Sequence, residues 1–282
     1  MNKGTLYIVA TPIGNRSDIS ERAIEVLKQV DLIAAEDTRH SKGLMQFYGI
    51  STTLQACHDH NEEQVTLRFI EQLLAGENIA LISDAGTPLV SDPGYRLVKA
   101  AHEAGIPVSP LPGACAAIAA LSASGLATDR FLFAGFPPHK QVARQRFYAE
   151  FEQQTATLVF YESSHRIVLS VNDLLAVFGG ERKIVLAREI SKIFETIHNG
   201  VLNDLPGWLA ADLNQQKGEF VLVLEGAATK PDAGMLELES VLKVLLEELP
   251  LKQASQIASK ITGIKKNTVY RQALEMSDKG VR

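Results

Sequence analysis

Cysteine is scarce in this sequence: Cys57 and Cys115 are the only two among 282 residues, and they form no CxxC pair. That scarcity argues against a disulfide framework and against a structural zinc site. Two phosphate-binding signatures are absent as well, since no segment carries GxGxxG, or GxxxxGK followed by Ser or Thr. A Rossmann dehydrogenase or a P-loop nucleotidase is therefore not indicated.

Long hydrophobic runs are also few. The apolar run at residues 6–10 is too short for the core of a signal peptide, and the richest apolar stretch, residues 114–126, is made of small residues interrupted by serine. We expect no membrane segment, no membrane partner and a cytoplasmic location. With 46% hydrophobic residues and a formal charge of -5, the chain fits a globular protein of two domains with an appended segment. DNA is not an expected partner.

The most informative stretch is residues 79–94, with the sequence IALISDAGTPLVSDPG. Residues 79–82 form a continuous apolar run, as expected for a strand buried on both faces of a parallel sheet. Loops at the carboxyl ends of such strands line the ligand crevice of open α/β sheets. Asp84 and Asp92 therefore belong to the floor of a small-molecule site, or else they cap backbone amides in Asx-type turns.

Residues 1–120 form the first predicted domain, built from strand-loop-helix units. Strands are expected at residues 5–10, 31–35, 53–56, 79–82 and near 108, where surrounding prolines limit the strand to an edge. Helices are expected at residues 20–30, with Ser20 as N-cap, at 61–74, at 95–104 and after Gly113. This alternation predicts an α/β domain with a mostly parallel sheet, whose crevice is rimmed by the loops at 11, 36, 84 and 112.

Residues 36–40, EDTRH, place four ionisable groups at the end of a predicted strand. They form either part of the crevice or a solvated helix N-terminus whose acids favour the helix dipole. His58 and His60 flank an aspartate, but they lack a third ligand at a familiar spacing. We therefore predict no metal site there.

Residues 121–228 form the second predicted domain, in which strands follow one another more closely. Strands are expected at residues 131–134, 158–161, 183–187, 195–198 and 220–224, which suggests a mixed sheet. Between the first two lies a basic, turn-rich segment, residues 137–146, containing Lys140, Arg144 and Arg146. It is either a mobile surface loop or a contact for phosphate groups of a nucleic acid.

Residues 227–234 resemble a linker, and residues 235–282 form a predicted helical lobe. Helices at 236–249, 252–261 and 266–276, with a glycine turn at 262–264, give a helix-turn-helix outline. Between Leu249 and Leu274 no acidic residue occurs, and the basic residues are Lys252, Lys260, Lys265, Lys266 and Arg271. This segregation favours a face that binds nucleic-acid phosphates, although a small helical cap that serves only packing remains an alternative.

Seven motifs in order resemble those of the ribosomal RNA small-subunit methyltransferase I family. They are VATPIGN (9–15), AAEDTRH (34–40), ISDAGTPLVSDPG (82–94), PLPGACAA (110–117), YESSHR (161–166), LAREISKIFE (186–195) and KGEFVLVLEG (217–226). The family that the chain resembles lies within the tetrapyrrole-methylase-like, or class III, S-adenosylmethionine-dependent methyltransferases. The resemblance implies two α/β domains of that type with the cofactor in the cleft between them, and a homodimer. It also implies methylation of a cytidine ribose 2′-hydroxyl in the decoding centre of 16S rRNA in the small ribosomal subunit.

The resemblance also assigns roles to residues. Cofactor contacts are implied for Ser83, Asp84, Ala85, Ala116, Ala117, Tyr161, Glu162, Ala187, Glu219 and Val221. Candidates for the catalytic proton transfer and charge stabilisation are Glu36, Asp37, Arg39, His165, Arg166, Glu189 and Lys192. Contacts with RNA are expected from Lys140, Arg144 and Arg146 and from Lys260, Lys265, Lys266 and Arg271 in the lobe. Arg16 departs from the family pattern, in which an apolar residue is expected after the PIGN turn.

Two other functions stay open at this stage. A methyltransferase with the same cleft would act on a tetrapyrrole, although the basic lobe and the AEDTRH segment weigh against that acceptor. A noncatalytic RNA-binding protein would need none of the cleft loops.

Overall fold

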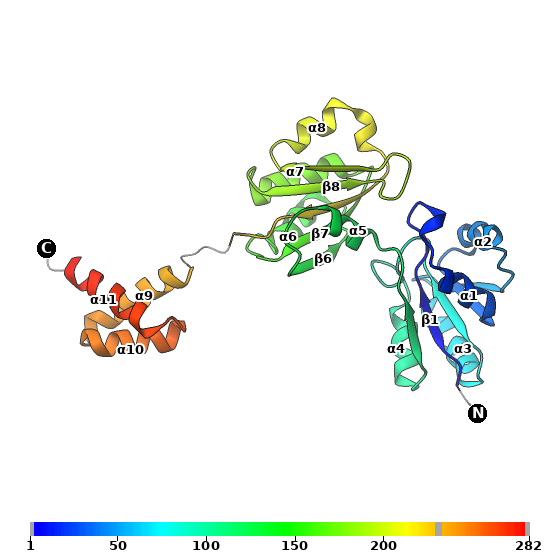
Figure 1. Ribbon diagram of the computed structural model, residues 1–282, viewed down its shortest axis with the longest axis horizontal. Coiled ribbons are helices and arrows are strands. Elements are labelled where there is room, and N and C mark those ends of the chain that lie inside the picture. The colour runs from blue at the N-terminus through cyan, green and yellow to red at the C-terminus, as the bar shows by residue number, and fades with distance from the viewer. Residues whose placement is uncertain (1–2, 229–232, 280–282) are drawn as a thin grey trace. The chain divides into compact units, whose positions relative to one another are not determined.

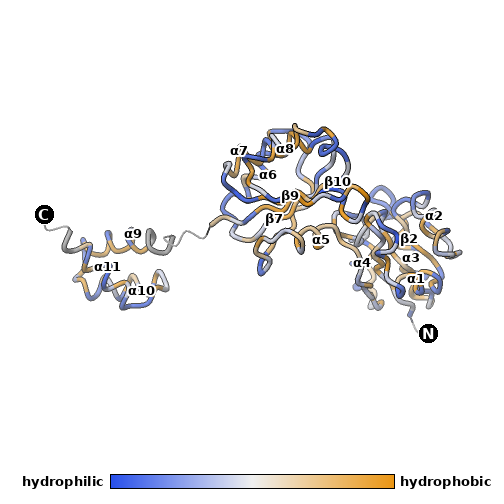
Figure 2. Tube along the Cα trace, turned by 45° about the horizontal axis from the view of Figure 1, so that its top comes forward, coloured by the Kyte–Doolittle hydropathy of each residue, from blue (hydrophilic) through white to orange (hydrophobic). Residues whose placement is uncertain are grey.

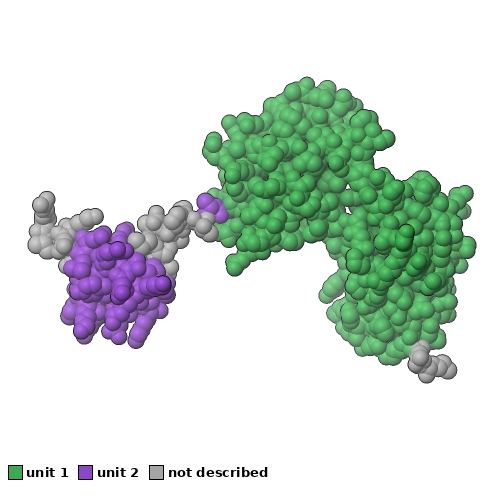
Figure 3. Space-filling view, viewed as in Figure 1, with its two compact units in different colours: residues 1–226 green, residues 227–282 purple. Residues whose placement is uncertain are grey.

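The computed structural model describes residues 3–228 and 233–279 (Figure 1). Its contacts divide the chain into two compact units, residues 1–226 and 227–282, coloured green and purple in Figure 3. The first unit contains both sheets, and the second contains the helical lobe. Part of the predicted linker, residues 229–232, lies outside the described residues.

The first sheet has five parallel strands in the order β3-β2-β4-β1-β5. The strands are β1 (Leu6–Val9), β2 (Leu32–Ala35), β3 (Leu54–Ala56), β4 (Ile79–Ile82) and β5 (Val108–Leu111). All residues of β2 and β4 are buried, which explains their continuous apolar sequences. β5 contains Pro110 and lies at the edge of the sheet, so the predicted parallel sheet with a proline-limited edge strand is confirmed.

Two helices cover each face of this sheet. Helices α1 (Glu21–Gln29) and α2 (Thr38–Phe47) pack on one face. Helices α3 (Glu62–Leu74) and α4 (Tyr95–Glu103) pack on the other. α1 begins as predicted, because the Ser20 hydroxyl oxygen accepts a hydrogen bond from the Ala23 amide at 3.2 Å. A short 3-10 helix, η1 (Arg16–Asp18), precedes α1.

The second sheet has the order β6-β7-β10-β8-β9. The strands are β6 (Phe131–Gly135), β7 (Thr157–Ser163), β8 (Lys183–Arg188), β9 (Thr196–Val201) and β10 (Glu219–Leu224). β6 is parallel to β7 and all other neighbours are antiparallel, so the predicted mixed sheet is confirmed. β9 ends later in the chain than the predicted strand at 195–198.

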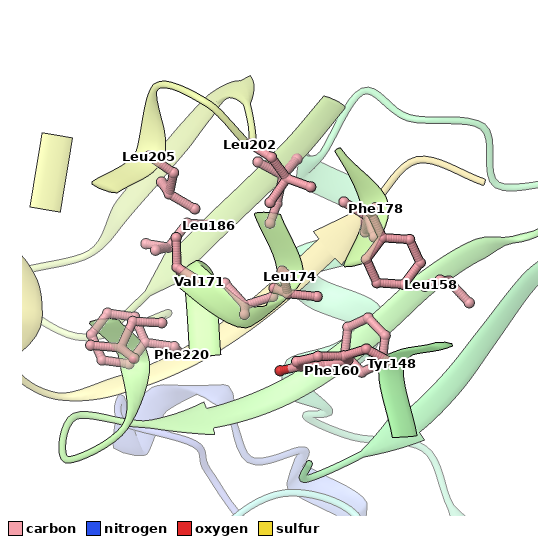
Figure 4. Packing of buried hydrophobic residues seen from close by; sticks show 14 of the residues in the cluster. Tyr148, Leu158, Phe160, Val171, Leu174, Phe178, Leu186, Leu202, Leu205 and Phe220 are labelled. Carbon is pink, nitrogen blue, oxygen red and sulfur yellow. The ribbon is translucent and has the colours of Figure 1, made fainter. Parts of the chain in front are cut away.

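One face of the second sheet is covered by α6 (Gln141–Ala149), α7 (Ile167–Phe178) and α8 (Leu205–Ala211). Figure 4 shows the core on this face, where Tyr148 of α6 packs against Phe160 of β7. The other face is covered by α5 (Ala116–Ala123). Although α5 directly follows β5 in the chain, its buried residues pack on the second sheet. By packing, the second domain therefore begins before α5, ahead of the predicted boundary at residue 121.

The basic segment at residues 137–146 is not a continuous surface loop. Its second half is the start of α6, and the Arg144 side chain is 2% exposed within an ion pair of 2.6 Å with Asp173. The prediction that Arg144 contacts RNA is wrong, because a buried guanidinium already paired with a carboxylate cannot reach a phosphate. Lys140 and Arg146 are exposed, so their contact with RNA stays a prediction.

The second unit is a three-helix lobe of α9 (Ala233–Glu248), α10 (Leu251–Thr262) and α11 (Lys266–Lys279). Its core includes Leu242, Ala258 and Val269, and Figure 2 shows hydrophobic and hydrophilic residues alternating along the helices of the lobe. Gly263 ends α10 in the left-handed conformation, with φ 70°, so the helix-turn-helix outline is confirmed. The predicted RNA contacts Lys260, Lys265, Lys266 and Arg271 are all exposed.

Within residues 3–228 and 233–279, no helix has both the length and the apolar composition needed to span a membrane. The same residues contain no group of three or more His, Cys, Asp or Glu side chains arranged to hold a metal ion.

Candidate active site

A pocket of about 480 Å³ lies within the first unit. It is lined from the first sheet by the loop after β4, and from the second sheet by the end of β7, the start of β10 and the loop after β8. Its volume lies in the range of small-molecule and cofactor sites, roughly 300 to 1,000 Å³. The loop at residues 84–92 forms a large part of the lining, as expected for a loop at the carboxyl end of a parallel strand.

Three carboxyl groups make one wall of the pocket acidic: Glu36, Asp84 and Asp92. The Asp84 amide donates to Glu36 Oε2 at 3.4 Å, and Asp84 Oδ1 accepts from the Asp37 amide at 3.1 Å. Burial raises the pKa of Glu36, an effect that the Asp84 amide partly offsets and the Asp84 charge reinforces. Burial, together with the charges of Glu36 and Asp84, also raises the pKa of Asp92 to about 6. A cationic ligand would relieve this repulsion.

The loop after β4 is held in place by backbone contacts. Thr11 and Gly86 exchange two backbone hydrogen bonds, of 2.9 and 3.0 Å. The Thr87 hydroxyl donates to the Ala114 carbonyl oxygen at 3.0 Å. Two non-glycine residues of the loop, Leu89 and Ser91, have positive φ angles of 71° and 66°. Such strained backbone persists only where surrounding structure fixes it, which is typical of binding sites.

Lys192 lies on the opposite wall, in the loop after β8. Its Nζ donates to Glu189 Oε1 at 2.8 Å and to Glu219 Oε2 at 2.7 Å. Burial acts to lower the pKa of Lys192, but hydrogen bonds to the two carboxylates outweigh it and raise that pKa. Burial likewise acts to raise the pKa of Glu189, yet the Lys192 hydrogen bond leaves it lowered. Lys192 therefore remains a cation and cannot serve as a proton acceptor near neutral pH.

The end of β7 supplies the third side of the pocket. The Tyr161 hydroxyl oxygen accepts from the Ala117 amide at 3.1 Å, which links the strand to the first turn of α5. The Glu162 carboxylate is buried and accepts from the Ser170 hydroxyl at 2.6 Å. Arg166 forms an ion pair with Glu162 at 2.9 Å. Arg166 therefore orients Glu162 and does not itself line the pocket.

The structure brings ten of the predicted cofactor and catalytic residues to the pocket lining: Glu36, Asp84, Ala85, Ala116, Tyr161, Glu162, His165, Lys192, Glu219 and Val221. Ser83, Ala117 and Ala187 do not line it, because their side chains are buried, Ala117 and Ala187 in the core between α5 and the second sheet. Glu189 acts on the lining through Lys192 and through the Glu219 amide, which donates to Glu189 Oε1 at 2.9 Å.

Asp37 and Arg39 also lie outside the lining. Asp37 Oδ1 accepts from the Arg39 amide at 2.8 Å and caps α2. The hydrogen bond from the Arg39 side chain lowers the pKa of Asp37 to about 2. The helix N-terminus interpretation thus describes Asp37 and Arg39, whereas Glu36 of the same motif belongs to the pocket.

A second cavity of about 370 Å³ adjoins the pocket. Asp84, Ala85, Lys192 and Glu219 line both cavities. Residues found only in the second include Arg16, which was not predicted for the site, and His40, which belongs to the EDTRH segment that the crevice interpretation covers. A sequence signal existed for each: Arg16 departs from the family pattern, and His40 ends the EDTRH segment.

Residues 5–206 match the family described as Tetrapyrrole (Corrin/Porphyrin) Methylases, so the fold and the pocket define a protein of the tetrapyrrole methylase class. The uroporphyrin-III-C-methyltransferase of Thermus thermophilus shares this fold, with a TM-score of 0.55 and 24% identity, over 79% of this chain and 94% of that chain. Diphthine synthase shares it with a TM-score of 0.58 and 16% identity, over 79% of this chain and 90% of that chain.

Much more similar relatives carry the name Ribosomal RNA small subunit methyltransferase I. The Pseudomonas aeruginosa protein is 53% identical over 99% of this chain and 100% of its own length. The Escherichia coli O157:H7 protein is 51% identical over 97% of this chain and 96% of its own length. Residues 232–277 match the RsmI C-terminal HTH domain. The chain belongs to the ribosomal RNA small subunit methyltransferase I family, as its seven motifs indicated.

Proposed function

We propose that the protein transfers a methyl group from S-adenosylmethionine to the ribose 2′-hydroxyl of a cytidine in the decoding centre of 16S rRNA. The observation that carries the proposal is the acidic wall formed by Glu36, Asp84 and Asp92 beside the fixed cation Lys192. The relatives named for small-subunit rRNA methylation support the choice of acceptor.

The residues of the pocket fit S-adenosylmethionine. Its sulfonium and ammonium charges complement the three crowded carboxyl groups, which lack a paired cation on their own wall. Gly86 in the lining has no side chain to block close approach to its backbone, whereas at Gly218 the Glu189 side chain occupies the place of a Cβ. The residues that would hold the cofactor are Asp84, Ala85, Ala116, Tyr161, Glu162, Glu219 and Val221. When bound, the cofactor supplies a methyl group already activated by the adjacent positive sulfur.

The chain itself then has two tasks. It must hold the acceptor oxygen in line, and positioning of this kind supplies several kcal/mol of a reaction barrier. It must also accommodate loss of the hydroxyl proton. Glu36 and Asp92 have raised pKa values, which suits a proton acceptor, while Lys192 stays positive and can stabilise charge that develops on the oxygen. Of the predicted catalytic residues, Glu36, His165 and Lys192 are the ones that line the pocket.

We further propose a homodimer, located in the cytoplasm, that binds RNA through its basic residues. Support for association comes from Ile193 and Phe194, which are 94% and 67% exposed just before the edge strand β9. Support for a reducing compartment comes from Cys57 and Cys115, both free thiols in the structure. The exposed Lys260, Lys265, Lys266 and Arg271 support RNA binding by the lobe.

The test is methylation of purified 30S subunits that lack the modification, with labelled S-adenosylmethionine and mass spectrometry of the nucleosides. We expect one methyl group per subunit, recovered as 2′-O-methylcytidine, and no transfer to a porphyrinogen. Transfer to a base, or to the porphyrinogen alone, would exclude the proposed acceptor. A Lys192→Gln variant that binds the cofactor but transfers slowly would place Lys192 in the reaction.

A further inference from the structure

The second cavity opens on the same group of residues as the cofactor pocket. Asp84 and Lys192 line both, so a ligand in the second cavity can meet a ligand in the pocket at these two side chains. The remainder of the second cavity is formed by the loop before η1 and by one side of α2, which contributes His40, Gly43 and Leu44. The acceptor of the proposed reaction must approach through a space of this kind.

Arg16, at the wall of this cavity, forms a flat exposed surface with Phe47. The Arg16 guanidinium carbon lies 4.4 Å from the centre of the Phe47 ring. Phe47 is the last residue of α2 and is 57% exposed, although it is a large apolar side chain. The Tyr48 hydroxyl donates to the Arg16 carbonyl oxygen, and the Tyr48 ring meets Phe47 edge-on at 4.9 Å. We call this arrangement of Arg16, Phe47 and Tyr48 the Arg16 platform.

The part of the second cavity that it does not share with the pocket carries basic side chains. Arg16 and His40 line the second cavity, and α2 also exposes Arg39 and Lys42. The three carboxyl groups of the pocket, by contrast, favour a cation. The second cavity thus has carboxylates, Asp84 and Glu219, at the end that it shares with the pocket, and basic side chains from η1 and α2 that suit the phosphates of an anionic acceptor.

We propose that the second cavity admits one nucleotide of single-stranded RNA and that the Arg16 platform holds the base of a neighbouring nucleotide by stacking. The inference rests on the proposed function, because it specifies how the acceptor of that reaction is held. Sequence-specific recognition of RNA uses unstacked bases laid on aromatic rings and guanidinium planes, and the phosphates between them are met by cations. The platform supplies both kinds of group at the wall of the second cavity, which Arg16 lines.

A simpler role for Arg16 would be to shield Phe47 from water. The substitution Arg16→Leu separates the two roles, since leucine covers the ring but offers neither a planar cation nor a charge. Phe47→Leu serves as the second variant, because it keeps an apolar side chain at the end of α2 and removes only the ring.

The controls are Arg68→Leu and Leu67→Ala on α3, which packs on the opposite face of the first sheet. Both positions are exposed, with Leu67 at 72%. They match the test variants in charge and in loss of apolar surface, and neither residue lines the two cavities.

For each variant of the full chain, the experiment measures the Kd for S-adenosylmethionine, the melting temperature, and kcat and KM for 30S methylation. It also measures the Kd for a short single-stranded oligoribonucleotide and for a fully duplex RNA. Arg16→Leu and Phe47→Leu should each raise KM and the oligoribonucleotide Kd by roughly tenfold, as expected for loss of one stacked base. The Kd for S-adenosylmethionine and the melting temperature should stay near wild type. Arg16→Leu should also reduce the log-log salt slope of binding by about 0.7, whereas Phe47→Leu leaves the slope unchanged.

The inference is overturned if Arg16→Leu and Phe47→Leu match their α3 controls in KM and oligoribonucleotide Kd. It is also overturned if they weaken binding of a fully duplex RNA as much as of the single strand, because a duplex offers no unstacked base. If the wild-type protein methylates no RNA, the proposed function fails instead, and the oligoribonucleotide measurement still decides whether the platform binds a single strand.

Discussion

The Lys192 side chain crosses directly over Gly14: a Cβ atom added at Gly14 would lie 2.3 Å from Lys192 Cγ and 3.1 Å from Cε. Nearby, the Ser191 hydroxyl donates to the Asp18 carboxylate. The loop after β8 therefore meets the loop before η1, and the only residue at position 14 that leaves room for Lys192 is glycine. This contact places the cation where the pocket and the second cavity meet.

Gly14→Ala should therefore impair catalysis more than folding. The methyl group displaces the stem of Lys192, which breaks its hydrogen bonds to Glu189 and Glu219. Because Lys192 and Glu219 are accessible to water, the loss of these ion pairs should cost only about 1 kcal/mol of stability. We expect kcat for 30S methylation to fall at least about tenfold, with a melting temperature close to wild type. Gly207→Ala on α8, where an added Cβ meets nothing within 4 Å and which lines neither cavity, is the control. Equal kcat values for the two variants would contradict the prediction.

Asp84 should contribute to cofactor binding through its charge and to loop order through its hydrogen bond. Asp84→Asn keeps an oxygen that can accept from the Asp37 amide, now 3.1 Å away, but removes the charge. Asp84→Ala removes both. Calorimetry should show weaker S-adenosylmethionine binding for both variants, by roughly 1.5 to 3 kcal/mol for alanine. A variant that loses its fold would assign Asp84 to turn capping instead. Chelator should not change the wild-type affinity, because we predict no metal site.

Asp92 should make stability and cofactor binding depend on pH near 6. Its folded-state pKa is raised to about 6 from 3.8, so the folded protein binds the proton more tightly than the unfolded chain. The free energy of unfolding should therefore fall as pH rises from about 4 to 6 and then level off, by up to about 3 kcal/mol. Cofactor affinity should change in the opposite direction, because a cation binds better once Asp92 is ionised.

The substitution Asp92→Asn tests the predicted direction of both pH dependences. The variant should be more stable than wild type at pH 7, should lose the pH-dependent step, and should bind S-adenosylmethionine less tightly above pH 6. Chemical denaturation at several pH values gives the first two quantities, with the exposed Asp129→Asn as control. A variant with the same pH profile as wild type would show that another group titrates.

The buried pair of Arg144 and Asp173 should be structural. Arg144 donates to Asp173 at 2.7 Å, and Gln145 donates to the same carboxylate at 2.7 Å. Arg144→Met leaves that carboxylate buried without its cation, which should cost about 3 to 5 kcal/mol of stability. The double variant Arg144→Met, Asp173→Leu should recover much of the loss. Arg146→Met, at an exposed position on the same helix, should leave stability near wild type and weaken RNA binding instead.

The lobe should act on RNA and not on the cofactor, because the pocket lies wholly within residues 1–226. Neutralising Lys260, Lys265, Lys266 and Arg271 together to glutamine should reduce 30S methylation and flatten the salt dependence of RNA binding. Each lost phosphate contact lowers the log-log slope by about 0.7 to 0.9. Truncation after Gly226 should give the same effect and leave the Kd for S-adenosylmethionine unchanged. Equal salt slopes for wild type and the quadruple variant would assign the lobe to packing.

Much of this fold was already determined by local patterns in the sequence. The continuous apolar runs of β2 and β4 require burial on both faces, and Pro110 restricts β5 to an edge, so the parallel sheet follows. Once the sheet is parallel, the loops at residues 36 and 84 must meet at one edge. The helix-turn-helix outline likewise followed from apolar periodicity and one glycine, Gly263.

Only the tertiary structure decided which residues far apart in the chain contact one another. Arg144 lies in a basic segment of the sequence that suggests an RNA contact, yet its side chain is buried in an ion pair with Asp173, 29 residues away. The contact between Lys192 and Gly14 joins a loop after β8 of the second sheet to a loop after β1 of the first. Apolar periodicity shows which face of a helix or strand is buried, because the spacing of apolar residues within that one segment defines the face. It cannot report which charge partner fills a given interior site, since the gain from pairing depends on distance and burial that exist only once the chain has folded.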